Sequence, residues 1–124
     1  MIKVKHFMDE AEPDDGTRIW VEPFGLTRDL CDWCHVNYIV VDVAPPRELW
    51  DWFEDHPQAY ELFRGCYHTH LEHAGVRADL QTLANAARHE NVTLLHQSED
   101  PERNSAMALY EFLSELNAYC PPDG

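Results

Sequence analysis

The segment Asn91-Val92-Thr93-Leu94-Leu95-His96 is a short apolar run that lacks the alternation of a half-exposed strand. Runs of this kind are typical of strands that are buried on both faces of a parallel sheet. The preceding residues, from Val76 to Ala87, place apolar side chains every three or four positions and predict a helix. A helix that leads into a fully buried strand indicates a domain of the α/β class.

Further strands are predicted in the N-terminal half of the chain. Residues Ile2–Phe7 alternate apolar and polar side chains, and Arg18–Glu22 form a second candidate strand that Pro23 stops. The run Tyr38–Val43 is rich in β-branched residues and fits a strand, although a turn of buried helix fits it as well. The sequence therefore predicts three strands, at Ile2–Phe7, Arg18–Glu22 and Asn91–His96, and leaves open whether a fourth segment, Tyr38–Val43, is strand or helix.

Four other helices are predicted from capping residues and apolar stripes. They are expected to start at Thr27, Pro46, Pro57 and Asp100, and the last to end near Ala118. Strands separated by helices indicate a small three-layer α/β domain with a short, largely parallel sheet flanked by helices. We expect one domain over residues 1–118 and a flexible C-terminal tail over residues 119–124.

The charge of the chain restricts its partners. Acidic residues number 23 and basic residues 9, so the formal net charge is −14 with neutral histidines. Nucleic acid and anionic membranes are disfavoured, because their affinity depends on clustered Lys and Arg. A homodimer, a cationic protein partner and a small-molecule ligand remain open.

Neither an export signal nor a membrane span is evident in the sequence. The N-terminal residues lack a long apolar run, and no stretch approaches the roughly 20 apolar residues of a transmembrane helix. We therefore expect a cytoplasmic protein whose four cysteines are thiols or metal ligands rather than structural disulfides.

A set of polar side chains follows the predicted strands. Its members are Glu22, His96, Glu99, Asp100 and Asn104. Ligands of parallel sheets bind beyond the carboxyl ends of the strands, so these residues are the candidate ligand-binding site. A histidine among carboxylates can act as a general base or as a metal ligand. The alternative is that Asp100 and Glu99 only cap the helix that follows them.

The string Cys31-Asp32-Trp33-Cys34-His35 is a candidate metal site. Cys31, Cys34 and His35 could supply part of a zinc site, completed by Cys66, Cys120 or a histidine of the His68–His73 segment. The same spacing occurs in covalent haem attachment, which is disfavoured here because that chemistry takes place outside the cytoplasm. The other interpretations of Cys31 and Cys34 are a redox dithiol and two part-buried structural cysteines.

Three histidines of the segment His68-Thr69-His70-Leu71-Glu72-His73 have the spacing that opens a binuclear metallohydrolase motif. That motif belongs to a loop in a longer chain, whereas this segment continues a helical stripe. We therefore interpret these histidines as surface residues near a helix end.

Short motifs along most of the chain resemble those of a known family. The carriers are Met1-Ile2-Lys3-Val4-Lys5, Asp14-Asp15-Gly16-Thr17-Arg18, Ala44-Pro45-Pro46-Arg47-Glu48-Leu49, Trp52-Phe53, His56-Pro57, Phe63, Tyr67, Val92-Thr93-Leu94-Leu95, Asp100 and Asn104. Their order resembles domain of unknown function 488, the YeaO-like proteins, over roughly residues 1 to 117. The resemblance implies a small α/β fold with no settled biochemical activity.

The chain departs from the family pattern beside the candidate site. Members of the family normally follow the second strand with Asp-Arg-Leu-Trp-Pro-Arg-Gly, whereas this chain has Glu22-Pro23-Phe24-Gly25-Leu26. Glu99 stands where the family has a lysine, and Arg103 where it has a histidine. If the family pocket accepts an anion through its basic groups, the resemblance implies that this function is lost or altered here.

Three readings of function follow from the sequence. The first is a small molecule bound in a cleft at the carboxyl ends of the strands, with catalysis unproven. The second is a non-catalytic protein-interaction or accessory domain, which a closed cleft and an exposed apolar patch would favour. The third is metal binding at the Cys-x-x-Cys string. No reaction class and no cofactor are assigned by the residues.

Overall fold

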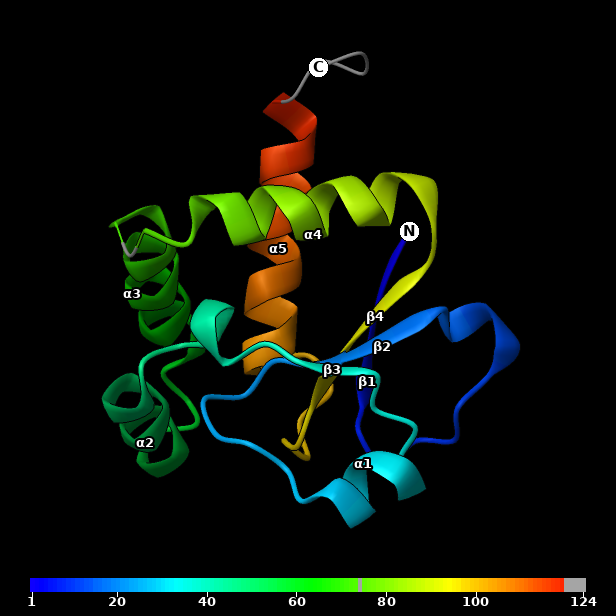
Figure 1. Cartoon of the computed structure of the whole chain (residues 1–124). Helices are drawn as coiled ribbons and strands as arrows, with labels where there is room; N and C mark the ends of the chain where they lie inside the picture. Colours follow the sequence, from blue (N-terminus) through cyan, green and yellow to red (C-terminus); the bar gives the residue numbers. More distant parts are fainter. Residues whose placement is uncertain (74, 120–124) are drawn as a thin grey trace.

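The computed structural model describes residues 1–73 and 75–119 of the chain, and its centre is a parallel sheet (Figure 1). The strands lie in the order β1-β4-β2-β3, and each neighbouring pair is parallel. Their bounds are β1 Ile2–His6, β2 Thr17–Trp20, β3 Tyr38–Ile39 and β4 Val92–His96. The expected α/β domain with a short parallel sheet is confirmed, and the Val92–His96 strand lies inside the sheet, as its apolar sequence predicts.

One face of the sheet is mainly apolar, and the other, called here the polar face, carries Lys3, Lys5 and Arg18 together with Trp20 and Leu95. Leu94 is the register partner of both Val4 and Ile19, and these three side chains share one face. Thr93 is the partner of Lys3 and Arg18 on the opposite face. The two faces therefore need different covers.

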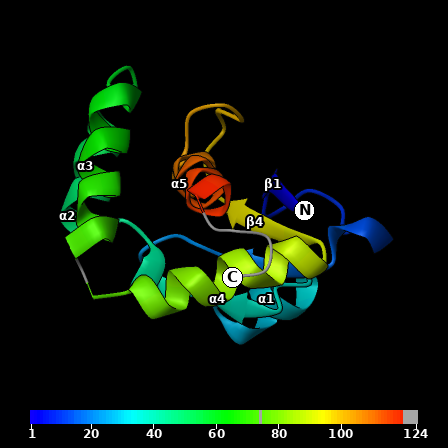
Figure 2. The same cartoon turned by 90° about the horizontal axis from the view of Figure 1, so that it is seen from above.

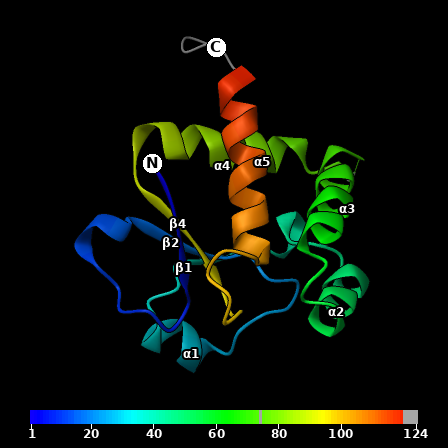
Figure 3. The same ribbon diagram turned by 180° about the vertical axis from the view of Figure 1, so that it is seen from behind.

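Four helices lie on the apolar side of the sheet. They are α2 Arg47–Asp55, α3 Tyr60–His73, α4 Arg77–His89 and α5 Ser105–Tyr119. Helix α5 packs on β1 and β4 and contacts both α3 and α4. It crosses α4 (Figures 1 and 3). Seen from above, α5 lies between the α2–α3 pair and the sheet (Figure 2). The apolar core includes Phe63, Tyr67, Leu94, Leu109 and Leu113, all of them fully buried.

The polar face is covered by a short helix and a loop. Helix α1, Arg28–Trp33, begins after Thr27, whose hydroxyl accepts a hydrogen bond from the Leu30 N–H, as the sequence predicts. The guanidinium of Arg18 donates to the carbonyl of Cys34 just beyond this helix. A 3-10 turn, η1 Pro13–Asp15, completes the cover. The sheet thus lies between two unequal layers.

Several expected boundaries are shifted. The segment Tyr38–Val43 contains both alternatives, since a two-residue strand is followed by the 3-10 turn η2 Val41–Val43. The last helix begins at Ser105 instead of Asp100, and α3 begins at Tyr60 instead of Pro57. The predicted tail lies outside the described residues except for Tyr119, which ends α5.

Within residues 1–73 and 75–119, no helix combines the length and the apolar character needed to cross a lipid bilayer.

Candidate ligand site at the carboxyl ends of the strands

A cavity lies beyond the carboxyl ends of β1 and β4, where the sequence predicts a ligand site. Its volume is about 360 Å³, and its lining residues are Val4, Lys5, His6, Asp9, His96, Ser98, Glu99 and Pro101. We call it the His96 cavity. Two of the five predicted site residues, His96 and Glu99, line it.

His96 is the buried polar group of this cavity. The residue is only 2% exposed, and its Nδ1 has no hydrogen-bond partner within the described part of the chain. Burial, together with the nearby His6, lowers the pKa of the His96 imidazole to about 4. The ring is therefore neutral near pH 7 and offers one donor and one acceptor nitrogen.

The wall formed by the end of β1 is held by local hydrogen bonds. The Met8 N–H donates to Nδ1 of His6, at 3.1 Å, so Nε2 carries the proton that faces the Gln97 carbonyl at 3.3 Å. The His6 N–H donates to a carboxylate oxygen of Asp9. The His6 ring meets the His96 ring edge to face, with 5.6 Å between centroids. Both nitrogens of His6 are engaged, and its ring fixes the position of His96.

Asp100 and Asn104 do not line the cavity, because both act as caps. One carboxylate oxygen of Asp100 accepts hydrogen bonds from the N–H groups of Glu102 and Arg103, which lower the pKa of the Asp100 carboxyl. The Asn104 side chain accepts from the Met107 N–H and donates to the Asp100 carbonyl. Asn104 is therefore the cap of α5, and Asp100 caps the turn before it. A ligand role for either residue stays a prediction.

Glu22 is buried outside the His96 cavity. It is 2% exposed, and its Oε2 accepts from the indole N–H of Trp50 at 3.3 Å, while Oε1 has no partner with hydrogen-bond geometry among the described residues. Burial raises the pKa of the Glu22 carboxyl, although Ser105 and Trp50 act in the opposite direction. Glu22 does not line the His96 cavity, so the expected single cluster is divided in two.

A row of aromatic rings closes the end of β2. The rings of Phe7, Trp20, Phe24 and Trp50 follow one another with centroid distances of 5.2, 5.7 and 5.0 Å. The Trp20 indole N–H also donates to the Phe24 carbonyl at 2.6 Å. Sequence reasoning did not find this row, because its members come from three separate segments and share no periodicity. The His96 cavity lies on the β1–β4 side of the strand ends, and a second hollow, of about 300 Å³, lies between the end of β1 and α1.

Comparison with known proteins now identifies the family. The family model described as "Inactive DUF488-N3 subclade" matches residues 1–119. The chain belongs to this DUF488-N3i family. The "Uncharacterized protein Mb3100c" of Mycobacterium bovis and the "Uncharacterized protein Rv3073c" of Mycobacterium tuberculosis are each 30% identical to this DUF488 domain over 88 residues, which are 66% of the chain and 70% of each relative. No solved structure matches the chain.

The Cys-x-x-Cys string of this DUF488 domain does not gather its donor atoms. Cys34 is buried with its Sγ 3.6 Å from the sulfur of Met8, Cys31 is half-buried, and His35 is exposed with a positive φ of 55°. Within the described ranges, the one group of three closely spaced donors is Glu12, Asp14 and Asp15, not the cysteines. The metal hypothesis for Cys31, Cys34 and His35 therefore remains a prediction without geometric support.

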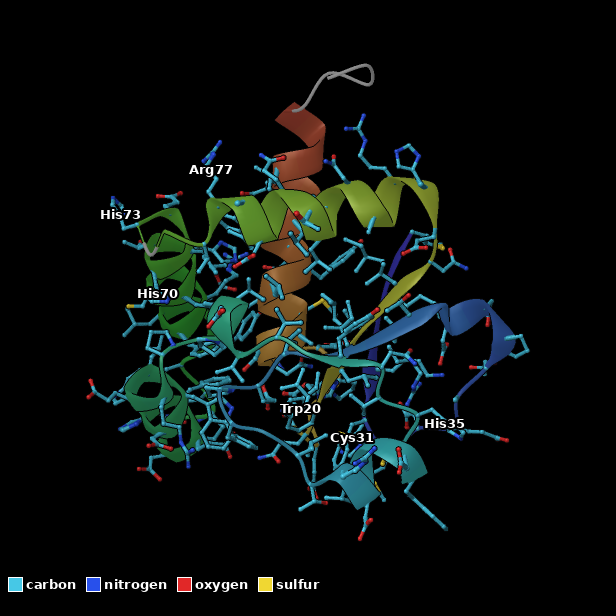
Figure 4. All side chains as sticks on the ribbon, in the orientation of Figure 1. Trp20, Cys31, His35, His70, His73 and Arg77 are labelled. Carbon is cyan, nitrogen blue, oxygen red and sulfur yellow. The ribbon has the colours of Figure 1, made fainter. Side chains whose placement is uncertain are left out.

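The histidines of α3 lie far from the cysteines. Figure 4 places His70 and His73 along one end of the helical layer and places Cys31 and His35 near α1, across the molecule. His68 is engaged with the Ala108 carbonyl, and His73 contacts the carbonyl of Thr69 in its own helix. These histidines cannot complete a site at Cys31, and Cys120 lies outside the described residues.

Proposed function

We propose that this DUF488 domain binds a small, uncharged or cationic molecule in the His96 cavity and does not transform it. The observation that carries the proposal is the neutral, buried imidazole of His96, which lines the cavity and whose Nδ1 has no partner with hydrogen-bond geometry among the described residues. An unsatisfied buried polar atom is costly, and a ligand that supplies its hydrogen bond removes that cost.

The chemistry of the lining favours a ligand that donates hydrogen bonds. Asp9 and Glu99 contribute carboxylates, and the one lysine of the lining, Lys5, is already held by Glu12, Asp15 and the Glu10 carbonyl. An anion would meet like charges without a free cation to receive it. The cavity volume of about 360 Å³ falls within the range of small-molecule pockets.

Absence of catalysis fits both the residues and the family. The matched subclade is described as inactive, and the resemblance implies that basic groups have been replaced, with Glu99 at the position of a lysine. A histidine whose pKa is about 4 is a weak general base at neutral pH, because efficient bases have a pKa near the working pH.

A ligand screen on three proteins tests the proposal. Saturation-transfer NMR would compare a set of neutral and cationic heteroaromatic compounds with a set of small carboxylates and phosphates. We expect hits only from the first set, and we expect them to shift the ¹⁵N resonances of the His96 imidazole. Glu99→Arg should remove the hits, because the new side chain reaches across the opening of the cavity.

Glu102→Arg is the matched control, since this substitution makes the same change of charge at a residue that is also exposed and does not line the cavity. Hits that survive Glu99→Arg, or that shift resonances away from His96, would place the ligand elsewhere. Binding confined to the anionic set would show that the proposed ligand chemistry is wrong.

A further inference from the structure

A second hollow lies at the other edge of the sheet, between β3 and α4. Its volume is about 460 Å³, and its lining residues are Thr17, Ile19, Tyr38, Val40, Asp79, Thr82, Leu83, Ala86, Glu90 and Val92. We call it the β3–α4 groove. It shares no lining residue with the His96 cavity, so its role is independent of the function proposed above.

The groove continues onto exposed apolar side chains. Tyr38, which lines the groove, is 64% exposed, and the nearby Val41 is 44% exposed, whereas Ile39 pairs with Trp20 and points to the opposite face of the sheet. Several large apolar side chains exposed together mark an interaction site more often than a single exposed one does. The floor between them and α4 is apolar as well, with Ile19, Leu83 and others facing the hollow.

The two edges of the sheet are guarded differently. At one edge, β1 carries Lys3 and Lys5, which are held in ion pairs with acidic residues of the loop before β2. At the other edge, β3 consists of Tyr38 and Ile39, and no further strand pairs with it among the residues that the structure describes. Lysines protect an edge against added strands, whereas an apolar edge accepts them.

The charged side chains that line the groove have one sign, while the N-terminal ammonium of Met1 beside it is held by the carbonyls of Ala87 and Glu90. Asp79 and Glu90 line it, and the lining contains no lysine, arginine or histidine. The adjacent Asp42 adds another exposed acidic residue beside Val41. An apolar floor between carboxylates is complementary to a segment that alternates apolar and basic side chains.

We infer that the β3–α4 groove is a docking site for an extended, basic and amphipathic segment of a partner protein. The segment lies along the free edge of β3, its apolar side chains enter the groove toward Ile19 and Leu83, and its Lys or Arg side chains meet Asp79 and Glu90. A second copy of this chain is the poorer occupant, because each copy has a net charge of −14 and presents the same carboxylates at the groove.

Fluorescence anisotropy with defined peptides tests the inference. The probe is a fluorescein-labelled peptide that alternates Lys and Val, and its two comparison peptides replace Val by Ser or Lys by Glu. At about 0.15 M salt, we expect the Lys-Val peptide to bind at least about tenfold more tightly than either comparison peptide. Amide NMR shifts should locate the bound peptide at Tyr38, Ile39 and Thr82.

Paired variants separate the groove from the general acidity of the molecule. Asp79→Asn with Glu90→Gln should weaken the Lys-Val peptide about tenfold, because it removes both lining carboxylates. The matched control is Glu48→Gln with Asp55→Asn, which neutralises two exposed acids of α2 outside the groove. The control should change the affinity less than about twofold, as expected for a long-range effect alone.

Thr82→Arg gives a separate test on an exposed position of α4, since the longer side chain fills the groove and should abolish binding. Equal losses in the groove variant and its α2 control would overturn the inference, as would a peptide that does not bind. Sedimentation velocity provides the remaining outcome. A dimer that Thr82→Arg dissociates would show that the occupant is a second copy and not a basic partner.

Discussion

Asp15 is the acidic centre of the polar face of the sheet. It is buried, its Oδ2 accepts from Arg18 at 2.7 Å and from Lys5 at 3.0 Å, and its Oδ1 accepts from Lys3 at 2.8 Å. Burial alone would raise the pKa of the Asp15 carboxyl, but the hydrogen bonds from Lys3 and Lys5 hold it well below its usual range. One carboxylate therefore balances three cations.

We expect Asp15→Asn to destabilise the fold by about 3 kcal/mol, because it leaves the buried guanidinium of Arg18 without its counter-charge. Urea denaturation followed by tryptophan fluorescence at neutral pH measures the change. Asp14→Asn is the control, since Asp14 is exposed and pairs only with Lys3. Equal effects of the two substitutions would show that the buried pair with Arg18 is not the source of the stability.

Glu22 is a buried carboxylate whose removal should stabilise the protein. Burial raises its pKa, so above that pKa the native state carries a charge that the unfolded chain solvates better. Glu22→Gln keeps an acceptor for Trp50 and removes the charge. We expect the free energy of unfolding of Glu22→Gln to exceed that of the wild type at alkaline pH.

The gain at Glu22 should be smaller at acidic than at alkaline pH, because the wild-type carboxyl then binds its proton in the native state. Urea denaturation at the two pH values measures this difference. A loss of stability in Glu22→Gln at every pH would indicate that the ionised carboxylate holds the core together.

His96 should give the fold a distinct sensitivity to acid. Its pKa is about 4 in the native state and about 6.5 in the unfolded chain, so between these values the unfolded chain binds the extra proton. The contribution of His96 to the free energy of unfolding is therefore complete above about pH 6.5. It is lost as the pH falls, and the loss reaches roughly 3 kcal/mol at most below about pH 4. In His96→Gln this part of the pH dependence should be absent. If the free energy of unfolding falls with pH by the same amount in His96→Gln and in the wild type, the burial of His96 does not depress its pKa as described.

At the scale of elements, the boundary of β2 depends on one glycine. Gly16 has a φ of +64°, and a Cβ there would stand 2.0 Å from the Asn91 carbonyl oxygen, beside the start of β4. Gly16→Ala should cost about 3 kcal/mol or more, because it combines backbone strain with a clash against the main chain. Gly75→Ala is the control, since its φ is also positive but its Cβ would meet open space. Thermal unfolding that lowers the midpoint equally in both variants would assign the effect to φ alone.

The elements that the sequence predicts best are those with a local cause. Val92–His96 is a strand because its continuous apolar run can be buried on both faces, and α1 begins at Arg28 because the Thr27 hydroxyl caps it. The start of α5 was predicted wrongly because Asp100 and Asn104 are both capping residues, and the sequence does not say which one opens the helix. Local patterns alone cannot resolve two caps four residues apart.

The sequence predicts only part of the candidate site, because local patterns do not show how distant elements pack. The cavity beside His96 follows from the rule that ligands bind at the carboxyl ends of parallel strands. The same rule does not predict that Glu22 lies outside the cavity. That separation depends on the position of α2, which brings Trp50 over the end of β2. The β3–α4 groove likewise arises from two elements that are distant in the sequence, and no motif marks it.

At the scale of the whole molecule, the net charge of −14 sets a repulsion that the specific contacts oppose. Sodium chloride screens exposed charges over about 10 Å at 0.1 M, whereas buried pairs such as Arg18–Asp15 are screened much less. We therefore expect added salt to stabilise the fold at neutral pH, measured as a higher urea midpoint. Near the isoelectric point, about pH 4.7, the net charge vanishes and the effect of salt should largely disappear. If salt instead lowers the midpoint at neutral pH, the ion pairs of Lys3 and Lys5 with the exposed Asp14 and Glu12 contribute more than the repulsion removes. The acidity would then have to be explained by a partner such as the basic segment inferred for the β3–α4 groove.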